Sequence, residues 1–169
     1  MKYLLRLAVA AVAILAMGCS NAADTTKETS QTNSAHVAES AAVQMKPEVV
    51  MYKPPTCNCC TGWAEHLQRA GFKVVIHKRD DMQAIKAEHG VTRKLASCHT
   101  AIVDGYVIEG HVPAADVERL LKERPDIVGL TAPGMPQKAP GMQSPGLPPR
   151  GYEVLAFNKS GTTTLFHRY

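Results

Sequence analysis

Three of the five cysteines lie within four residues, in the stretch Thr56–Thr61, which reads Thr-Cys-Asn-Cys-Cys-Thr. An apolar run, Val49–Tyr52, precedes it and predicts a buried strand, which ends at Lys53-Pro54-Pro55 because proline cannot donate to a sheet. A helix is predicted over Thr61–Ala70, with Gly71 as its stop. The cysteines therefore lie at a strand-to-helix junction, where unpaired N–H groups and the helix dipole favour thiolates over thiols.

The rest of the chain predicts alternating strands and helices. The expected elements are a strand over Phe72–His77, a helix from Asp80 and Asp81 to His89, a hairpin of Thr100–Val103 and Tyr106–Glu109, a helix over Pro113–Glu123, and a closing hairpin of Tyr152–Phe157 and Thr162–Arg168. The order β-α-β-α-β-β-α, with cysteines at its first strand-to-helix junction, predicts an α/β chain with a thioredoxin-like fold.

One segment breaks this alternation. Leu130–Gly151 is dense in proline and glycine and contains two similar pieces, Ala132–Pro136 and Ala139–Gln143, each with an Ala-Pro-Gly-Met start. We expect no regular element in it. Loops of this length inside compact domains are usually functional or disordered.

The first residues have the features of an export signal. Lys2 and Arg6 form a positive start, and Leu7–Ala16 is an apolar run too short to span a bilayer. Gly18 precedes Cys19, as in lipoprotein signals, so residues 1–19 are predicted to end in a lipidated Cys19 that anchors the chain to a membrane. The alternative is an ordinary secretory signal and a soluble periplasmic protein. Both place the chain outside the cytoplasm, in the periplasm.

Residues 20–47 are rich in Ser, Thr, Ala, Asn and Gln and contain no aromatic residue, so we expect a flexible tether. The domain is then predicted over 48–169. The formal net charge is only +4, and two of the positive residues lie in the expected signal. So weak an excess gives no reason to propose a nucleic-acid partner.

Four cysteines remain once Cys19 is set aside. Three crowded neighbours cannot all reach good disulfide geometry with one distant partner, so metal ligation or redox exchange explains the crowding better. The fourth, Cys98, is followed by His99 just before the predicted third strand. A redox thioredoxin has a cis-proline at that place, and the replacement by a sulfur and an imidazole favours a metal site over a disulfide exchanger.

The donor types point to a soft metal. Thiolates and thioethers select Cu(I) or zinc. Zinc would be satisfied by cysteine and histidine alone and would leave Met135 and Met142 without a role, so zinc is the less favoured metal. Several Cu(I) ions bridged by the same sulfurs would neutralise the charge of four thiolates. The predicted metal ligands are Cys57, Cys59, Cys60, Cys98, His99, His111, Met135 and Met142. Glu109 is interpreted as a surface charge.

Taken together, four motifs carry a family resemblance. They are Cys57-Asn58-Cys59-Cys60, Cys98-His99-Thr100, the run Gly105–Pro113 and the Pro-Gly-Met repeats. Over about residues 47–169 the chain resembles the CopG-type periplasmic copper-resistance proteins. The resemblance implies a thioredoxin-like fold, copper bound at the cysteines, and a role in copper tolerance with redox conversion of copper.

The favoured hypothesis is an exported copper-binding protein that holds Cu(I), as a thiolate cluster, for buffering, transfer or redox conversion. Its partners would be copper ions and other periplasmic copper-handling proteins. Whether it turns over a substrate as a copper oxidoreductase stays open. Two alternatives remain, a thiol-disulfide oxidoreductase that uses Cys57 and Cys60, and a structural zinc domain.

Overall fold

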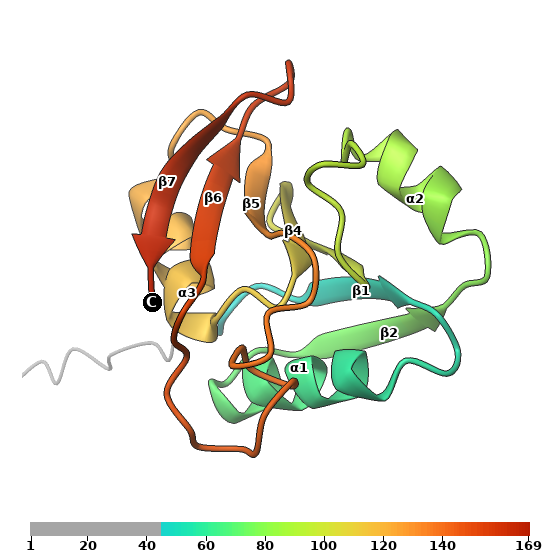
Figure 1. Cartoon of the computed structure of the whole chain (residues 1–169), viewed down its shortest axis with the longest axis vertical. Helices are drawn as coiled ribbons and strands as arrows, with labels where there is room; N and C mark the ends of the chain where they lie inside the picture. The colour runs from blue at the N-terminus through green and yellow to red at the C-terminus, as the bar shows by residue number, and fades with distance from the viewer. Residues whose placement is uncertain (1–44) are drawn as a thin grey trace, which may run out of the picture. The chain divides into compact units, whose positions relative to one another are not determined.

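The computed structural model describes residues 45–169 (Figure 1). The predictions made for residues 1–44, which include the signal, the lipidation of Cys19 and most of the tether, lie outside the described residues. Within the described part, every helix falls short of the length and apolar character needed to cross a bilayer.

Seven strands and three helices make up the described chain. In order they are β1 (Val49–Lys53), α1 (Asn58–Arg69), β2 (Val74–Lys78), α2 (Met82–Glu88), β3 (Thr100–Val103), β4 (Tyr106–Gly110), α3 (Ala114–Glu123), β5 (Gly129–Ala132), β6 (Glu153–Phe157) and β7 (Thr163–Arg168). The α/β class, the first seven elements and the closing hairpin are confirmed. α1 begins three residues earlier than predicted, directly inside the cysteine stretch.

The strands form one mixed sheet in the order β2-β1-β3-β4-β5-β6-β7. β1 is parallel to β2 and antiparallel to β3, and β4 is antiparallel to β3. This arrangement of the first four strands is compatible with the thioredoxin-like core that the sequence predicts. β4, α3 and β5 then form a parallel crossover, and β6 and β7 extend the sheet as an antiparallel hairpin.

The helices cover opposite faces of this sheet. Met51 on β1 is fully buried in the same cluster as Trp63 and Leu67 of α1, so α1 covers the face to which Met51 points. Tyr52, the next residue, points to the other face, where α2 contacts β1. Figure 1 shows α1 and α2 on opposite sides of β1 and β2.

One prediction for the fold is wrong. Leu130–Gly151 was expected to hold no regular element, but its first residues belong to β5, a fully buried strand in the interior of the sheet. The reason is tertiary, because the return of the chain through α3 places these residues beside β4, where they pair in parallel. A strand of four residues that begins with glycine and is followed by proline gives too short a pattern to be recognised in the sequence. The remainder of the segment is irregular, as expected.

The β4–β5 pairing yields a stability prediction. An alanine methyl at Gly129 would lie 1.8 Å from the carbonyl oxygen of Val107 on β4. Gly129→Ala is therefore expected to lower the free energy of unfolding by roughly 3 kcal/mol. The control is Gly90→Ala, where φ is +71° but nothing lies within 4 Å. It should cost only about 1 kcal/mol, the strain of a side chain at positive φ. Urea unfolding measures both, and equal losses would contradict the steric explanation.

Candidate metal centre

The cysteine stretch forms the first turn of α1. Cys57 is the N-cap, and its sulfur accepts a hydrogen bond of 3.3 Å from the Cys60 N–H. Cys57 and Cys60 are joined by a disulfide, whereas Cys59 and Cys98 are free thiols. The Cys59 sulfur lies 3.4 Å from that of Cys57. In this oxidised state two of the four predicted sulfur ligands are bonded to each other, so two-electron reduction must release them before they can bind a metal as thiolates.

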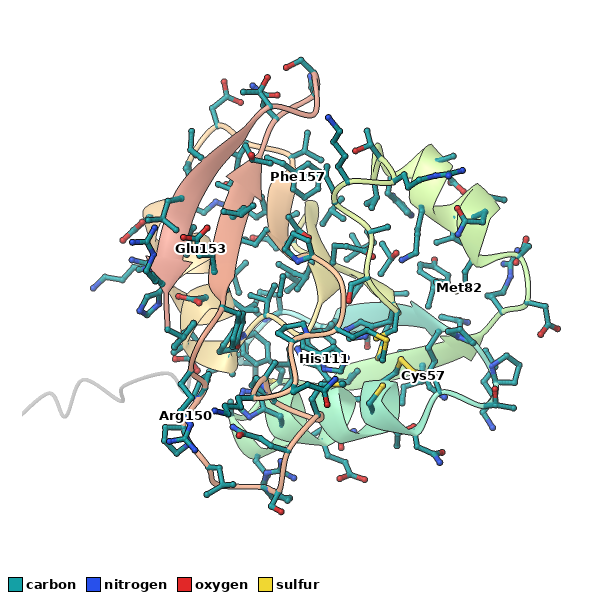
Figure 2. All side chains as sticks on the ribbon, in the orientation of Figure 1. Cys57, Met82, His111, Arg150, Glu153 and Phe157 are labelled. Atoms are coloured by element: carbon teal, nitrogen blue, oxygen red, sulfur yellow. A yellow bond between two sulfur atoms is a disulfide. The ribbon has the colours of Figure 1, made fainter. Side chains whose placement is uncertain are left out.

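Sheet pairing brings Cys98 to the same place. β3 runs antiparallel to β1, with Thr100 opposite Tyr52, so the residues just before β3 lie beside those just after β1. As a result, the sulfur atoms of Cys57, Cys59, Cys60 and Cys98 all lie within 4.8 Å of one another. Figure 2 shows sulfur atoms gathered beside the labelled Cys57 and His111. The convergence expected from a thioredoxin-like strand order is therefore present.

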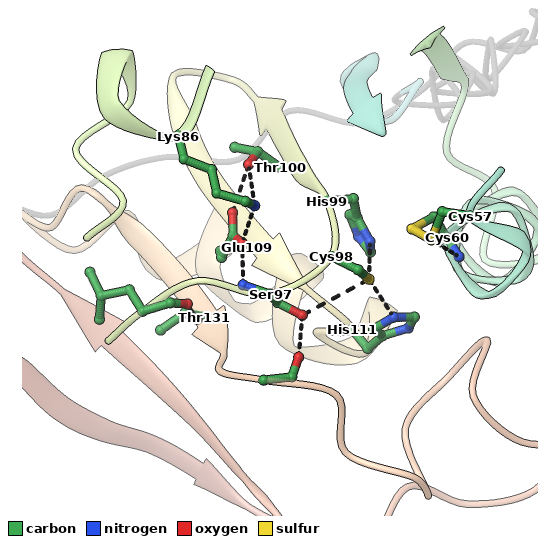
Figure 3. Close-up of polar contacts among 12 residues, drawn as sticks. Cys57, Cys60, Lys86, Ser97, Cys98, His99, Thr100, Glu109, His111 and Thr131 are labelled. Atoms are coloured by element: carbon green, nitrogen blue, oxygen red, sulfur yellow. Dashed lines mark hydrogen bonds and ion pairs between the residues drawn. A yellow bond between two sulfur atoms is a disulfide. The ribbon is translucent and has the colours of Figure 1, made fainter. Parts of the chain in front are cut away.

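Two buried histidines extend the group. The Cys98 sulfur lies 3.0 Å from Nε2 of His111 and 3.4 Å from Nδ1 of His99 (Figure 3). Nδ1 of His111 lies 2.7 Å from the carbonyl oxygen of Pro140. Because a carbonyl only accepts, Nδ1 carries the proton and Nε2 presents its lone pair toward Cys98. Both imidazoles are fully buried, and Nε2 of His99 has no hydrogen-bond partner.

Burial governs the protonation of these groups. It lowers the pKa of His111, and it lowers the pKa of His99 well below the usual histidine value, with His111 and Lys86 acting in the same direction. Burial, with a further contribution from Cys59, raises the pKa of Cys98 to about 12. The metal-free site at neutral pH thus contains neutral imidazoles and a protonated Cys98, because a low-dielectric environment disfavours the charged forms.

The proline- and glycine-rich segment covers this group. Gly141 lies so close to α1 that an added methyl would be 2.5 Å from the Cys59 carbonyl oxygen and 2.5 Å from the backbone nitrogen of Trp63. Met142 follows it directly and is half-buried, whereas Met135 is 51% exposed. The segment therefore reaches the centre at Pro140 and Gly141, and the roles of the two methionines as ligands stay predictions.

The interpretation of Glu109 as a surface charge is wrong. It is fully buried on β4 and accepts hydrogen bonds from Lys86 at 2.5 Å and from the Thr100 hydroxyl at 2.7 Å. Burial raises the pKa of Glu109, while the positive charge of Lys86 acts in the opposite direction. A signal was present in α2, since Met82, Ile85 and Lys86 share one helical face. A lysine on an apolar face indicates a buried partner.

These donors fit a soft metal. Two overlapping groups are present, one of four sulfurs and one of Cys98 with His99 and His111, and they share Cys98. Thiolate sulfur suits Cu(I) and zinc, and neutral imidazole suits copper and zinc. The buried, unpartnered Nε2 of His99 is a nitrogen that gains a partner if a metal binds there.

The close contact at Gly141 can be tested without metal. Gly141→Ala is expected to push the covering segment off α1 and to speed alkylation of the Cys59 thiol by roughly tenfold. Gly146→Ala is the matched control, since Gly141 and Gly146 have φ of +83° and +85° but nothing lies within 4 Å of an added methyl at Gly146. It should leave the alkylation rate unchanged. Mass spectrometry of timed alkylation samples measures both variants, and equal acceleration would refute the covering role.

A family model described as a protein of unknown function, DUF411, matches residues 95–142, which contain Cys98, His99 and His111. None of the curated proteins matches the chain. Two solved structures of a copper resistance protein CopG, Form 1 and Form 2, each share 40% sequence identity with it at a TM-score of 0.67. Each alignment covers 73% of this chain and 98% of the CopG chain.

Identity at this level over nearly the whole of the CopG chain exceeds what a shared fold alone would give. The resemblance that the cysteine and histidine motifs carry is thereby confirmed. The chain belongs to the CopG-type copper-resistance family.

Proposed function

We propose that this protein binds Cu(I) at the reduced cysteine group and serves copper tolerance by buffering, transfer or redox conversion of copper. The observation that carries the proposal is the convergence of four cysteine sulfurs within 4.8 Å in a chain that belongs to a copper-resistance family. So many sulfurs in so small a volume suit bridging between several soft cations.

The nitrogen donors add ligands of a second type to the sulfur group. Imidazole also suits Cu(II), so a site in which Cys98 is shared between sulfur-rich and nitrogen-rich groups has ligands for both oxidation states of copper. The Cys57–Cys60 disulfide adds a redox pair of its own, which stores two electrons when it is reduced. This combination supports redox conversion beside simple binding. We further propose that the chain acts in the periplasm, lipid-anchored through Cys19, and exchanges copper with other periplasmic proteins.

One observation favours a second candidate. The Cys57–Cys60 pair is oxidised and lies at the N-terminus of α1, where a thiol-disulfide oxidoreductase has its reactive pair. Against it stands Cys98, whose sulfur lies within 4.8 Å of both sulfurs of the pair, at the place where a redox thioredoxin has the cis-proline that receives its substrate peptide. We therefore rank copper binding first and let the experiment decide between them.

The first test is metal loading of the full chain, expressed with copper and purified without oxygen. We expect more than about one copper ion per chain with reduced cysteines, because shared thiolates bridge several ions. Cys57→Ala with Cys98→Ala should abolish tight binding, since it removes one sulfur from each of the two segments. Cys19→Ser is the control and should keep the wild-type stoichiometry. Elemental analysis and thiol titration give the readout.

Three outcomes would contradict the proposal. Unchanged copper stoichiometry in the double variant would exclude this group as the binding site. A copper-free chain with an intact Cys57–Cys60 disulfide and insulin-reducing activity would favour the oxidoreductase. A chain that takes up zinc in preference to copper would favour the structural zinc domain.

The raised pKa of Cys98 gives a pH dependence. Its pKa of about 12 lies above neutral pH, so the metal-free protein holds a proton that Cu(I) must displace. The apparent association constant should rise with pH, by about tenfold per pH unit for each thiol proton displaced. The buried histidines are already neutral and add no proton release. Competition with a chromophoric Cu(I) chelator between about pH 6 and pH 8 measures the slope. Cys98→Ser should give a shallower slope, and a flat wild-type profile would contradict the assignment.

A further inference from the structure

A single buried carboxylate holds the segment that carries two of the metal-binding residues. Oε1 of Glu109 accepts a hydrogen bond from the Ser97 backbone N–H, and Oε2 accepts one from the Thr100 hydroxyl. Ser97 and Thr100 lie immediately before and immediately after the Cys98-His99 dipeptide (Figure 3). Glu109 therefore fixes both ends of the dipeptide from the neighbouring strand.

This fixation matters because the local sequence restrains the dipeptide only weakly. The segment 91–99 contains no proline, and regular structure begins only at Thr100. Apart from Glu109, the dipeptide is bound to β4 through the Gly110 N–H, which donates to the His99 carbonyl oxygen at 3.0 Å. The residues before the dipeptide are also held on the other side, since Ser97 is bridged to Gly134 and the Gly134 N–H donates to the Ala96 carbonyl oxygen at 3.0 Å. Without the Glu109 carboxylate, the dipeptide itself would keep one backbone bond to β4, and any change in its conformation would move the sulfur and the imidazole relative to the other donors.

The residues after Glu109 continue the same arrangement. Gly110 has φ +71°, and an added methyl would lie 2.3 Å from the Ser97 hydroxyl oxygen, so only glycine lets Ser97 approach β4 this closely. The next residue is His111, whose Nε2 contacts Cys98 at 3.0 Å. Three consecutive residues therefore hold the Cys98 segment. Glu109 accepts the Ser97 N–H, Gly110 leaves room for Ser97 beside β4, and His111 contacts the Cys98 sulfur.

Stability alone does not explain the buried pair. The side chains of Lys86 and Glu109 are 5% and 0% exposed, and their closest atoms are 2.5 Å apart. Apolar residues that replace such a pair are often as stable or more stable, because they avoid the cost of removing two charges from water. An apolar pair, however, has no oxygen to accept the hydrogen bond that the Ser97 backbone N–H donates to Glu109. Lys86 also donates to the Thr100 hydroxyl at 3.1 Å, which orients that hydroxyl toward Glu109.

We propose that Glu109 is a positioning residue for the metal centre, whose carboxylate, neutralised by Lys86, sets the Cys98-His99 dipeptide at binding distance from the other ligands. The inference rests on the proposed copper-binding function. The inference adds Glu109 and Lys86, which do not touch the metal but determine how tightly the chain binds it.

The test compares two variants that differ in one group. Both carry Lys86→Met, which removes the buried cation. One adds Glu109→Gln, whose amide oxygen can still accept the Ser97 N–H, and the other adds Glu109→Met, which has the same shape and no oxygen acceptor. Both are expected to fold, because Thr131 still binds the Leu95 carbonyl oxygen at 2.6 Å and the apolar cluster is untouched.

The expected results separate the two. In the fully reduced chain, the methionine variant should bind Cu(I) roughly tenfold more weakly than wild type, whereas the glutamine variant should stay within about threefold of it. Competition with a Cu(I) chelator measures affinity, and thermal unfolding checks that both variants are folded. Equal wild-type affinity in both variants, or equal loss in both, would overturn the proposal.

Asp116→Asn is the control for a general effect of disturbing a buried carboxylate. Asp116 is 2% exposed and accepts hydrogen bonds from His167 and Tyr169 at 2.8 Å each, between α3 and β7. Its replacement should lower stability and leave Cu(I) affinity unchanged. If this variant loses as much affinity as the methionine variant, Glu109 has no special role and the proposal fails.

A metal-free measurement separates this inference from the proposed function. Amide hydrogen exchange over 97–100 should be faster in the methionine variant than in the glutamine variant. If wild type binds no copper, the proposed function fails, and faster exchange in the methionine variant would still establish that Glu109 holds the dipeptide. If wild type binds copper while exchange and affinity are the same in both variants, only the positioning role is overturned.

Discussion

The pairing of β1 with β3 is the constraint on which the rest of the centre depends. Tyr52 lies opposite Thr100 in this antiparallel ladder, so the chain leaving β1 and the chain entering β3 meet at one edge. Three cysteines follow β1, and the fourth, Cys98, precedes β3. A register slip of one residue would turn Met51 away from the apolar core, so the core enforces the register and the register places the sulfurs.

Burial gives the metal-free centre its chemical state. The same low-dielectric environment keeps the two imidazoles neutral and the Cys98 thiol protonated, so the donors can lie close together without mutual repulsion. A metal cation changes this balance because it supplies the positive charge that thiolates need. The folded, metal-free protein therefore keeps the imidazoles and the Cys98 thiol uncharged. Binding of a metal would require the thiol to release its proton.

The sequence was sufficient to predict the cysteine cluster and most of the fold, for a physical reason. Strands and helices of ordinary length leave periodic patterns, and cysteines crowded at a strand-to-helix junction mark a site before any contact is known. β5 was missed because a four-residue strand depends on its neighbours in the sheet. Glu109 was misread because a charge inside β4 can be recognised as buried only when its partner Lys86, far away in the sequence, is known to lie against it.

The disulfide and the covering segment together would restrict how copper enters under the proposed function. The Cys57–Cys60 bond makes two of the proposed ligands unavailable until it is reduced, and Gly141 lies against the carbonyl of Cys59. A reductant or a copper donor must therefore reach the sulfurs from the side not occupied by this segment, or displace it. Displacement would also break the contact between Pro140 and His111, which fixes the proton on Nδ1 of His111 and keeps Nε2 free. Access to the sulfurs and the orientation of a nitrogen ligand are thus coupled through one segment.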